Sequence, residues 1–278
     1  MNVVPTPIAL IALDLDGTLL DSSGSISAAN RAAIGAARTL GAAVAVVTGR
    51  AAADVDSSLL AALNLQLPVI CSHGAETIDP QSGAVTAHVP MPADHARTLL
   101  EHAERGALSA AAYVGGEYWC LEGTPSGMEH VRGPRWRPVR SLLGIPQYAP
   151  PTFVRMFGRE SIDAICTAFA GAPLHFKHEA WGTFEECAIT HLEATKERAL
   201  ARLCADFAIP REAVLAVGDS RNDVPMLRWA GVGVAMGNAA AEVRARVGRV
   251  TRTCDDDGVA RAIERYVLDP GASAERSA

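Results

Sequence analysis

Short, uninterrupted apolar runs recur in the first third of the chain, separated by longer segments rich in alanine. The runs show none of the polar alternation that a half-exposed strand needs, so they predict strands buried on both faces, as parallel strands usually are. They lie at residues 8–13, 42–47 and 69–70.

The segment between the first two runs has the features of a helix. Ser27 stands where an N-cap is expected, and Gly41 stands where the helix should end. Ile34 and Leu40, with the alanines between them, are expected to face the sheet. Residues 27–40 therefore predict the helix of a strand, helix, strand unit.

The same alternation of short apolar runs and helical segments occurs again toward the end of the chain. This pattern predicts that both ends of the chain contribute strands to one parallel sheet. Helical segments there are separated by two more apolar runs without polar alternation. The expected helices are 195–208, 224–230, 239–247 and 259–268, and the expected strands are 214–217 and 232–236.

The middle of the chain shows another pattern, in which more strands accompany each helix. The order strand, helix, strand, strand occurs twice, which is typical of an antiparallel sheet with helices on one face. We therefore predict an α/β protein: a doubly wound, Rossmann-like parallel sheet from residues 1–82 and 191–278, with an α+β cap domain inserted at 83–190. Within the insertion, the expected strands are 84–89, 108–114, 117–121, 152–157, 174–178 and 184–189, and the expected helices are 93–105 and 161–170.

The amino-acid composition is consistent with two folded domains, and the net charge argues against some classes of binding partner. At about 150 residues per domain, a chain of 278 residues with 49% apolar residues can fill two cores. The net charge of −6 argues against a protein that binds nucleic acid or acidic lipid through its bulk charge. The run at 8–13 is far shorter than the roughly 20 residues of a membrane span, so we expect no membrane anchor or signal peptide.

The six cysteines stand singly along the chain, and no two of them form a CxxC pair. The pattern therefore indicates neither a zinc site nor a framework of closely spaced disulfides. We expect the protein to reside in a reducing cytoplasm.

The strongest chemical signal is the motif Asp14-Leu15-Asp16-Gly17-Thr18, which directly follows the first predicted strand. Ligands of a parallel sheet bind beyond the carboxyl ends of its strands. Alternation along an extended chain aims both carboxylates the same way, and convergent carboxylates suit a hard cation such as Mg²⁺. A calcium loop is excluded because it needs a glycine and a glutamate at later positions where this chain has neither. An acidic surface turn is the alternative.

A second acidic motif, GDSRND at residues 218–223, follows the predicted strand at 214–217. It delivers Asp219, Asp223 and the amide of Asn222 to the end of another parallel strand. Alone, such a turn before a helix is as often a simple cap. Together with the motif at 14–18, it favours a metal site.

Two further segments suit a phosphate group. Thr48 and Gly49 follow the strand at 42–47 and offer a hydroxyl and an unobstructed backbone N–H, although such a pair also makes ordinary loops. Lys196 lies in the first turn of the helix that Thr195 is expected to cap, where a cation opposes the helix dipole. A solvated surface lysine is the alternative.

Charge links these motifs. The carboxylates of Asp14, Asp16, Asp219 and Asp223 outnumber the ammonium of Lys196, and a phosphate dianion increases the negative excess. Such a cluster needs a divalent cation. One Mg²⁺ and a proton on Asp16 reduce the excess to a charge that backbone N–H groups and helix N-termini can carry. The sequence therefore predicts Mg²⁺ as cofactor.

In these motifs the chain resembles the haloacid dehalogenase (HAD) superfamily of phosphohydrolases, and more closely its Cof-type branch, subfamily IIB, with a large α/β cap. Four motifs in the order of that family are far more specific than any one of them. The family's cap enters between the positions of Thr48 and Lys196, as the predicted insertion does. The matching segments are 14–21, 48–50, 196–200, 218–227, 235–239 and 257–259.

The resemblance implies a role for each matching residue. It implies that Asp14 attacks phosphorus to form an aspartyl-phosphate, and that Asp16 protonates the leaving oxygen and later deprotonates the hydrolytic water. It also implies that Mg²⁺ is held by the carboxylates of Asp14 and Asp219 and the backbone carbonyl of Asp16, with Asp223 in support. The phosphate-binding positions that it implies are Leu15, Thr48, Gly49, Lys196 and Asn222.

The chain departs from the family pattern at two positions. His73 stands where relatives commonly carry asparagine. The His73 side chain could touch the substrate or satisfy a loop carbonyl. Glu197 stands where glycine is usual, directly after Lys196. Near the end of the predicted cap, a polar cluster could line the substrate pocket, although an exposed strand face would look the same. The members of this cluster are His175, Lys177, His178, Trp181 and Glu185.

These observations predict a Mg²⁺-dependent phosphatase of small phosphorylated metabolites, with sugar phosphates as the first expectation by analogy. The expected partner is the small-molecule substrate, with no nucleic acid and no membrane. One alternative is a phosphomutase or phosphotransferase on the same fold, in which a sugar hydroxyl accepts the phosphoryl group. Another is a non-catalytic regulatory protein that binds phosphorylated metabolites.

Overall fold

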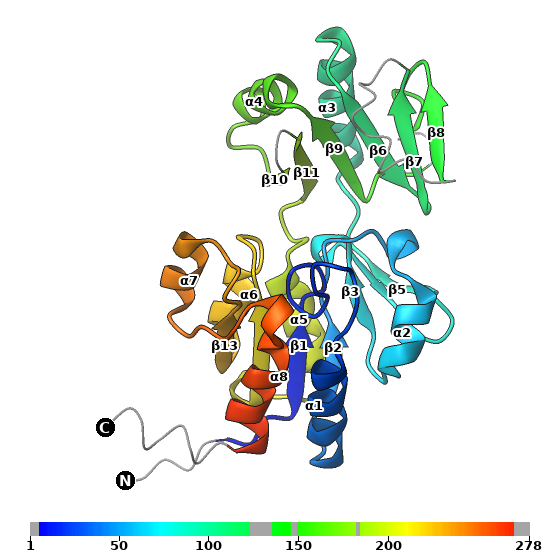
Figure 1. Cartoon of the computed structure of the whole chain (residues 1–278). Helices are drawn as coiled ribbons and strands as arrows, with labels where there is room; N and C mark the ends of the chain where they lie inside the picture. Colours follow the sequence, from blue (N-terminus) through cyan, green and yellow to red (C-terminus); the bar gives the residue numbers. More distant parts are fainter. Residues whose placement is uncertain (1–5, 123–134, 146–148, 182–183, 270–278) are drawn as a thin grey trace. The chain divides into compact units, whose positions relative to one another are not determined.

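The computed structural model describes residues 6–122, 135–145, 149–181 and 184–269. The chain forms two compact units, both drawn in Figure 1. The core unit comprises the described parts of Met1–Arg50, Val55–Thr86 and Thr195–Ala278, and the inserted unit comprises those of Ala51–Asp54 and Ala87–Ala194. The domain limits at 83 and 190 stay predictions.

A four-stranded parallel sheet forms the centre of the core unit. Its strands are β1 (Leu10–Leu13), β2 (Ala43–Val46), β12 (Val214–Gly218) and β13 (Val232–Ala235). They lie in the order β13-β12-β1-β2, with Leu13 opposite Val217 on one side and Val46 on the other. Every residue of β1 and β12 is buried, which confirms the prediction of strands covered on both faces.

Helices cover both faces of this sheet, which confirms the predicted doubly wound fold. The helices of the core unit are α1 (Ala28–Thr39), α2 (Ser57–Leu63), α5 (Lys196–Asp206), α6 (Val224–Trp229), α7 (Ala241–Val247) and α8 (Gly258–Ile263). On one face, Leu200 and Leu203 of α5 and Met226 of α6 pack with Leu10 and Ala216 of the sheet. Helices α1 and α8 pack together on the other face, the near side in Figure 1.

Helix α1 begins and ends with the predicted caps. The Ser27 hydroxyl accepts a hydrogen bond from the Asn30 N–H at 3.1 Å, and Gly41 follows in the left-handed region with φ +89°. Ile34 is buried as predicted, but Leu40 is 66% exposed. The prediction for Leu40 is wrong because this residue is the C-cap, beyond the last turn that packs against the sheet.

A second sheet, of three strands, corrects two predictions. Its strands are β3 (Val69–Cys71), β4 (Glu76–Ile78) and β5 (Val85–His88). The sequence predicts β3 in the parallel sheet, whereas β3 makes only one parallel bridge there, between Ile70 and Val47, and pairs antiparallel with β4. The sequence predicts β5 in the insertion's sheet, whereas β5 joins β4. Every residue of β5 is exposed, so its apolar pattern could not identify its sheet.

The inserted unit contains a six-stranded sheet. Its strands are β6 (Ala110–Val114), β7 (Glu117–Leu121), β8 (Trp136–Val139), β9 (Phe153–Phe157), β10 (Leu174–Trp181) and β11 (Phe184–His191). They lie in the order β10-β11-β9-β6-β7-β8, antiparallel except for the parallel pair of β7 and β8. The sheet is therefore mixed, not purely antiparallel as predicted. The prediction omits β8 because Arg137 and Pro138 interrupt its apolar pattern.

Two helices, α3 (Ala93–Arg105) and α4 (Arg159–Ala168), cover one face of this sheet, as predicted. Leu99 and Leu100 of α3 and Ile162 of α4 share a buried cluster with Val154 and Ile189 of the strands. No helix in the described part of the chain is long and apolar enough to cross a bilayer.

The other face of this sheet carries aromatic side chains and holds the segment 51–54. Tyr113 stacks on Phe153 with ring centroids 4.8 Å apart, and both pack against the fully buried Ala51. The Tyr113 hydroxyl accepts the Ala53 N–H at 3.2 Å, and the Tyr118 hydroxyl donates to Asp54. Four residues that lie far from the insertion in sequence therefore belong to its unit.

Candidate active site

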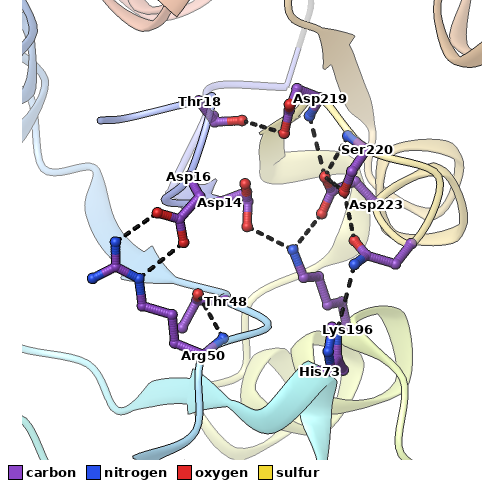
Figure 2. A network of polar contacts seen from close by, with 11 residues as sticks. Asp14, Asp16, Thr18, Thr48, Arg50, His73, Lys196, Asp219, Ser220 and Asp223 are labelled. Carbon is purple, nitrogen blue, oxygen red and sulfur yellow. Dashed lines mark hydrogen bonds and ion pairs between the residues drawn. The ribbon is translucent and has the colours of Figure 1, made fainter. Parts of the chain in front are cut away.

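The carboxyl ends of β1 and β12 bring the two acidic motifs together. Asp14 directly follows β1 and Asp219 directly follows β12, and the Asp14 N–H donates to Val217 O at 3.1 Å. The connections from these two neighbouring strands lead to opposite sides of the sheet, which is where open α/β sheets bind ligands. Oxygens of Asp14, Asp219 and Asp223 lie within 4.8 Å of one another (Figure 2).

Lys196 lies between two of these carboxylates. Its Nζ donates to Asp14 Oδ1 and to Asp223 Oδ1, each at 2.6 Å (Figure 2). The Lys196 side chain is 2% exposed, so it is not a solvated surface lysine. Burial lowers the pKa of this ammonium, but the attraction of the two carboxylates outweighs burial and raises the pKa above its ordinary value. Lys196 is therefore a buried, charged partner of both acids.

Asp223 is fully buried and organises the loop after β12. Its Oδ2 accepts the N–H of Asp219 at 3.1 Å, the N–H of Ser220 at 2.9 Å and the Ser220 hydroxyl at 2.9 Å. These donors, together with Lys196 on the other oxygen, stabilise the charged carboxylate. The motif GDSRND is therefore more than a helix cap.

The three carboxylates of Asp14, Asp219 and Asp223 carry more negative charge than the Lys196 ammonium can neutralise. Burial, followed by repulsion from Asp223, raises the pKa of Asp219 to about 6. Burial also raises the pKa of Asp14, against the attraction of Lys196. One ammonium cannot neutralise three acids, and carboxylate oxygens gathered in this way are the ligands that Mg²⁺ prefers. The residues present therefore fit the predicted cation.

The loop after β1 is built to approach Asp219 closely. A Cβ added at Gly17, where φ is +73°, would lie 2.5 Å from Asp219 Oδ2, so a side chain there would displace the Asp219 carboxylate. The Thr18 hydroxyl donates to Asp219 Oδ1 at 3.3 Å. Asn238 fixes the loop by donating to Gly17 O at 2.8 Å and accepting the Cys254 N–H at 2.9 Å. Asn238 is therefore a structural residue of the site; its place in the matching segment 235–239 does not by itself indicate this contact.

The side chain of Asp16 does not join the three clustered acids. Its Oδ2 accepts from Arg50 Nε at 2.9 Å and its Oδ1 accepts from Arg50 Nη2 at 2.5 Å (Figure 2). Asp16 is 60% exposed, whereas the intervening Leu15 is fully buried and presents no side chain to a ligand. In the sequence, Arg50 stands out only as part of a motif that matches the family. Its position directly after Thr48 and Gly49 is the signal that could have identified it.

Thr48 and Gly49 lie in the loop after β2. Thr48 is fully buried, its N–H donates to Ile70 O at 2.8 Å, and its Oγ1 accepts the Arg50 N–H at 3.1 Å. Gly49 lies against the imidazole of His73. The loop is therefore held from both sides, by β3 and by the turn that follows β3.

The two departures from the family pattern have local explanations. Glu197 lies in the first turn of α5, where the helix dipole favours an acidic side chain, and Thr195 caps that helix by accepting the Arg198 N–H at 3.2 Å. His73 is buried beside Asn222, with His73 Nδ1 and Asn222 Nδ2 3.4 Å apart. Asn222 therefore contacts His73 in addition to its place in the acidic motif.

The polar cluster predicted near the end of the insertion is partly buried within the inserted unit. The Nζ of Lys177 donates to Thr190 Oγ1 at 2.7 Å and to a main-chain carbonyl at 2.8 Å, so Lys177 belongs to the interior of the unit. His178 Nε2 lies 3.3 Å from a carboxylate oxygen of Glu185. The side chain of Trp181 lies outside the described residues.

Comparisons with known proteins agree with this geometry. Residues 11–263 match a family model described as haloacid dehalogenase-like hydrolase. The phosphatase YwpJ of Bacillus subtilis is 32% identical over 93% of this chain and 99% of that protein. The pyridoxal phosphate phosphatase YbhA of Escherichia coli is 28% identical over 93% and 98%. BT1666 of Bacteroides thetaiotaomicron, a solved structure among the HAD phosphatases, has a TM-score of 0.81 at 26% identity and covers 95% of this chain and 98% of its own.

Proposed function

Because the chain belongs to the haloacid dehalogenase-like hydrolases, as a Cof-type phosphatase of small phosphorylated metabolites, we propose that it hydrolyses sugar phosphates with Mg²⁺ through an aspartyl-phosphate on Asp14. One observation carries this proposal. Three buried or partly buried carboxylates and a buried lysine meet at the carboxyl ends of β1 and β12. Such a set suits a cation and a phosphoryl group together.

Asp14 is the residue of this set that is best placed as the nucleophile. It lies directly at the end of β1, and its carboxylate is held by the Lys196 ammonium. A carboxylate nucleophile divides a difficult hydrolysis into two easier steps, formation and hydrolysis of an acyl-phosphate. The ammonium reduces the repulsion between the attacking carboxylate and the anionic phosphoryl group.

Asp14, Asp219 and Asp223 are the residues that would hold Mg²⁺, with the backbone carbonyl of Asp16 added by family resemblance. When bound, Mg²⁺ neutralises charge on the phosphoryl oxygens and orients them. Thr18 and the backbone at Gly17 keep Asp219 in place for this task, because both approach its carboxylate directly. Asp14 would therefore serve both as nucleophile and as ligand, whereas Asp219 and Asp223 would serve as ligands only.

We assign proton transfer to Asp16. It would protonate the leaving oxygen and later accept a proton from the hydrolytic water, since the two half-reactions move the proton in opposite directions. In the structure its carboxylate is paired with Arg50, so transfer requires that pair to open. Opening an exposed ion pair costs about 1 kcal/mol or less, which is a small addition to a catalytic barrier.

Thr48, Gly49, Lys196 and Asn222 are the proposed contacts of the phosphoryl oxygens, with the backbone of Leu15. Thr48 Oγ1 already accepts the Arg50 N–H, so its own proton points elsewhere and is available to a phosphoryl oxygen. Gly49 carries no side chain that would shield its backbone N–H. These groups supply donors where negative charge develops in the reaction.

The test of this proposal is the Asp14→Asn variant, assayed for Mg²⁺-dependent phosphate release from an aryl phosphate and from a panel of sugar phosphates. Asparagine keeps the size of the side chain and removes the nucleophilic oxygen charge, so we expect release to be abolished. Asp79→Asn, the same change in a turn of the core unit, should keep the wild-type rate. Undiminished release by Asp14→Asn contradicts the assignment, and an isomeric phosphate product with little free phosphate indicates a mutase.

A further inference from the structure

We propose that His73 is a positioning residue of this active site, which holds the Asn222 amide and the Thr48–Gly49 loop in the arrangement that phosphoryl transfer needs. The inference rests on the proposed phosphatase reaction and goes beyond its catalytic and metal-binding residues. Four observations on the turn at residues 72–74 carry it: its backbone, its packing, its hydrogen bonds and its neighbours.

The backbone of this turn is held in an unusual conformation. Ser72 and His73 are consecutive non-glycine residues with positive φ, 51° and 57°. Such residues cost about 1–3 kcal/mol each and persist where the surroundings determine them. Here the Ser72 N–H donates to Arg50 O at 2.7 Å and the His73 N–H donates to Thr48 O at 3.2 Å. The turn is therefore clamped to the loop that we propose binds the phosphoryl group.

The imidazole of His73 packs directly on this loop. His73 is 4% exposed, and a Cβ added at Gly49 would lie 2.6 Å from its Cε1 and 2.9 Å from its Nδ1. Real Cβ atoms do not approach so closely, so the ring occupies the space that a side chain at position 49 would need. Glycine at this position thus serves the contact with His73 as well as the exposure of a backbone N–H.

A chain of polar contacts leads from the imidazole to the catalytic lysine (Figure 2). Asn222 Nδ2 lies 3.4 Å from His73 Nδ1, and the Ser220 hydroxyl lies 2.8 Å from Asn222 Oδ1 and 2.9 Å from Asp223 Oδ2. Asp223 in turn accepts from Lys196 at 2.6 Å. Because each partner orients the next, His73 helps to fix the orientation of the Asn222 side-chain amide.

The third neighbour of the turn is the N-terminus of α5. A Cβ added at Gly74, where φ is +101°, would lie 2.3 Å from Thr195 O and 3.0 Å from the backbone nitrogen of Lys196. The turn therefore touches three of the four segments that supply the proposed phosphoryl contacts: the loop after β2, the loop after β12 and the start of α5. A displacement of 1 Å among such groups can lower a rate about a hundredfold.

The first test is the His73→Asn variant. Asparagine tolerates positive φ better than most residues, so the turn is retained while the ring is removed. We expect kcat to fall about tenfold, as is common when a partner of an active-site group is removed. KM should change little, because the ring positions other groups instead of binding the substrate itself. His102→Asn, the same change in α3, should leave both constants at their wild-type values. An unchanged kcat in His73→Asn overturns the proposal.

The second test asks whether His73 acts through Asn222. In a double-mutant cycle of His73→Asn and Asn222→Ala, we expect the double variant to be no slower than the slower single variant. Losses that multiply overturn the proposal, because they show that the two residues act independently.

The third test does not depend on turnover. The side-chain amide signals of Asn222, identified in ¹⁵N NMR spectra by their loss in Asn222→Ala, should shift in His73→Asn and stay in place in His102→Asn. Unshifted signals in His73→Asn overturn the positioning role. If the wild-type protein released no phosphate, the proposed function would fail, and these signals would still decide whether His73 positions Asn222.

Discussion

The core unit and the inserted unit bury charged side chains in different ways. In the inserted unit, Arg155 lies 3.4 Å from Glu186, and Lys177 donates to the hydroxyl of Thr190 and to a main-chain carbonyl. Each of these charges meets an opposite charge or neutral oxygens. In the core unit, by contrast, three like charges are gathered within 4.8 Å around one ammonium.

The difference shows which kind of buried charge marks a ligand site. A buried charge that is balanced by an opposite charge or by neutral polar groups serves the folded structure, even though it has lost its hydration. Gathered carboxylates raise one another's free energy, and a bound cation or a proton relieves them. Like charges in close contact are therefore the informative feature, and burial of charge alone is not.

Replacing one buried lysine in each unit should change stability the most. In Lys196→Met, the buried carboxylates lose their ammonium, and we expect the free energy of unfolding to fall by about 3–5 kcal/mol, with loss of phosphate release. In Lys177→Met, two neutral oxygens lose a donor, and the expected loss is about 1–3 kcal/mol. Urea denaturation of both variants measures the difference. Equal losses of stability in the two variants would contradict the difference between the units.

The next effect is that of Mg²⁺ on stability. A ligand of the native state at a hundred times its Kd adds about 2.7 kcal/mol, so Mg²⁺ should raise the temperature at which the core unit unfolds. Asp219→Asn removes one of the gathered charges and should lose most of this increase, whereas Asp79→Asn should keep it. Calorimetry with and without Mg²⁺ provides the measurement, and an equal increase in all three proteins would exclude Asp219 as a ligand.

The smallest effect is on the dependence of stability on pH in the absence of Mg²⁺. The folded-state pKa of Asp219 is raised from 3.8 to about 6, so its contribution to stability is present below pH 3.8 and is lost as the pH rises through about 6. Asp219→Asn should therefore gain stability relative to the wild type between pH 4 and 7, by about 2 kcal/mol at most. A constant difference between the two proteins over this range would contradict the raised pKa.

The inserted unit should respond to pH in the opposite direction. Burial, together with the nearby Lys177 charge, lowers the pKa of His175 from 6.5 to about 4. Its contribution to stability is therefore present above pH 6.5 and is lost as the pH falls toward 4. His175→Gln should gain stability relative to the wild type as the pH falls from 7 to 4, by about 2 kcal/mol at most. A gain in the same direction as that of Asp219→Asn would remove the contrast between the units.

Local pattern predicts those parts of this molecule whose causes are local. Buried strands show as unbroken apolar runs, and acids placed after two parallel strands must meet at one edge of the sheet, so Asp14 and Asp219 could be brought together from the sequence. Helix α3 has the bounds that its pattern predicts. The exposed strand β5 has no burial pattern that identifies its sheet. The contacts of Arg50 and His73 depend on segments distant in the chain, which no local pattern encodes.

Residues 51–54 make the insertion a two-piece module. They belong to the inserted unit, although the residues on either side of them belong to the core unit. Tyr113 and Tyr118 recognise this tetrapeptide through hydrogen bonds to Ala53 and Asp54. A chimaera that exchanged only residues 87–194 with a relative would leave the tetrapeptide of one parent beside the aromatic side chains of the other. Transplanting the insertion intact therefore requires two splices, one for each piece.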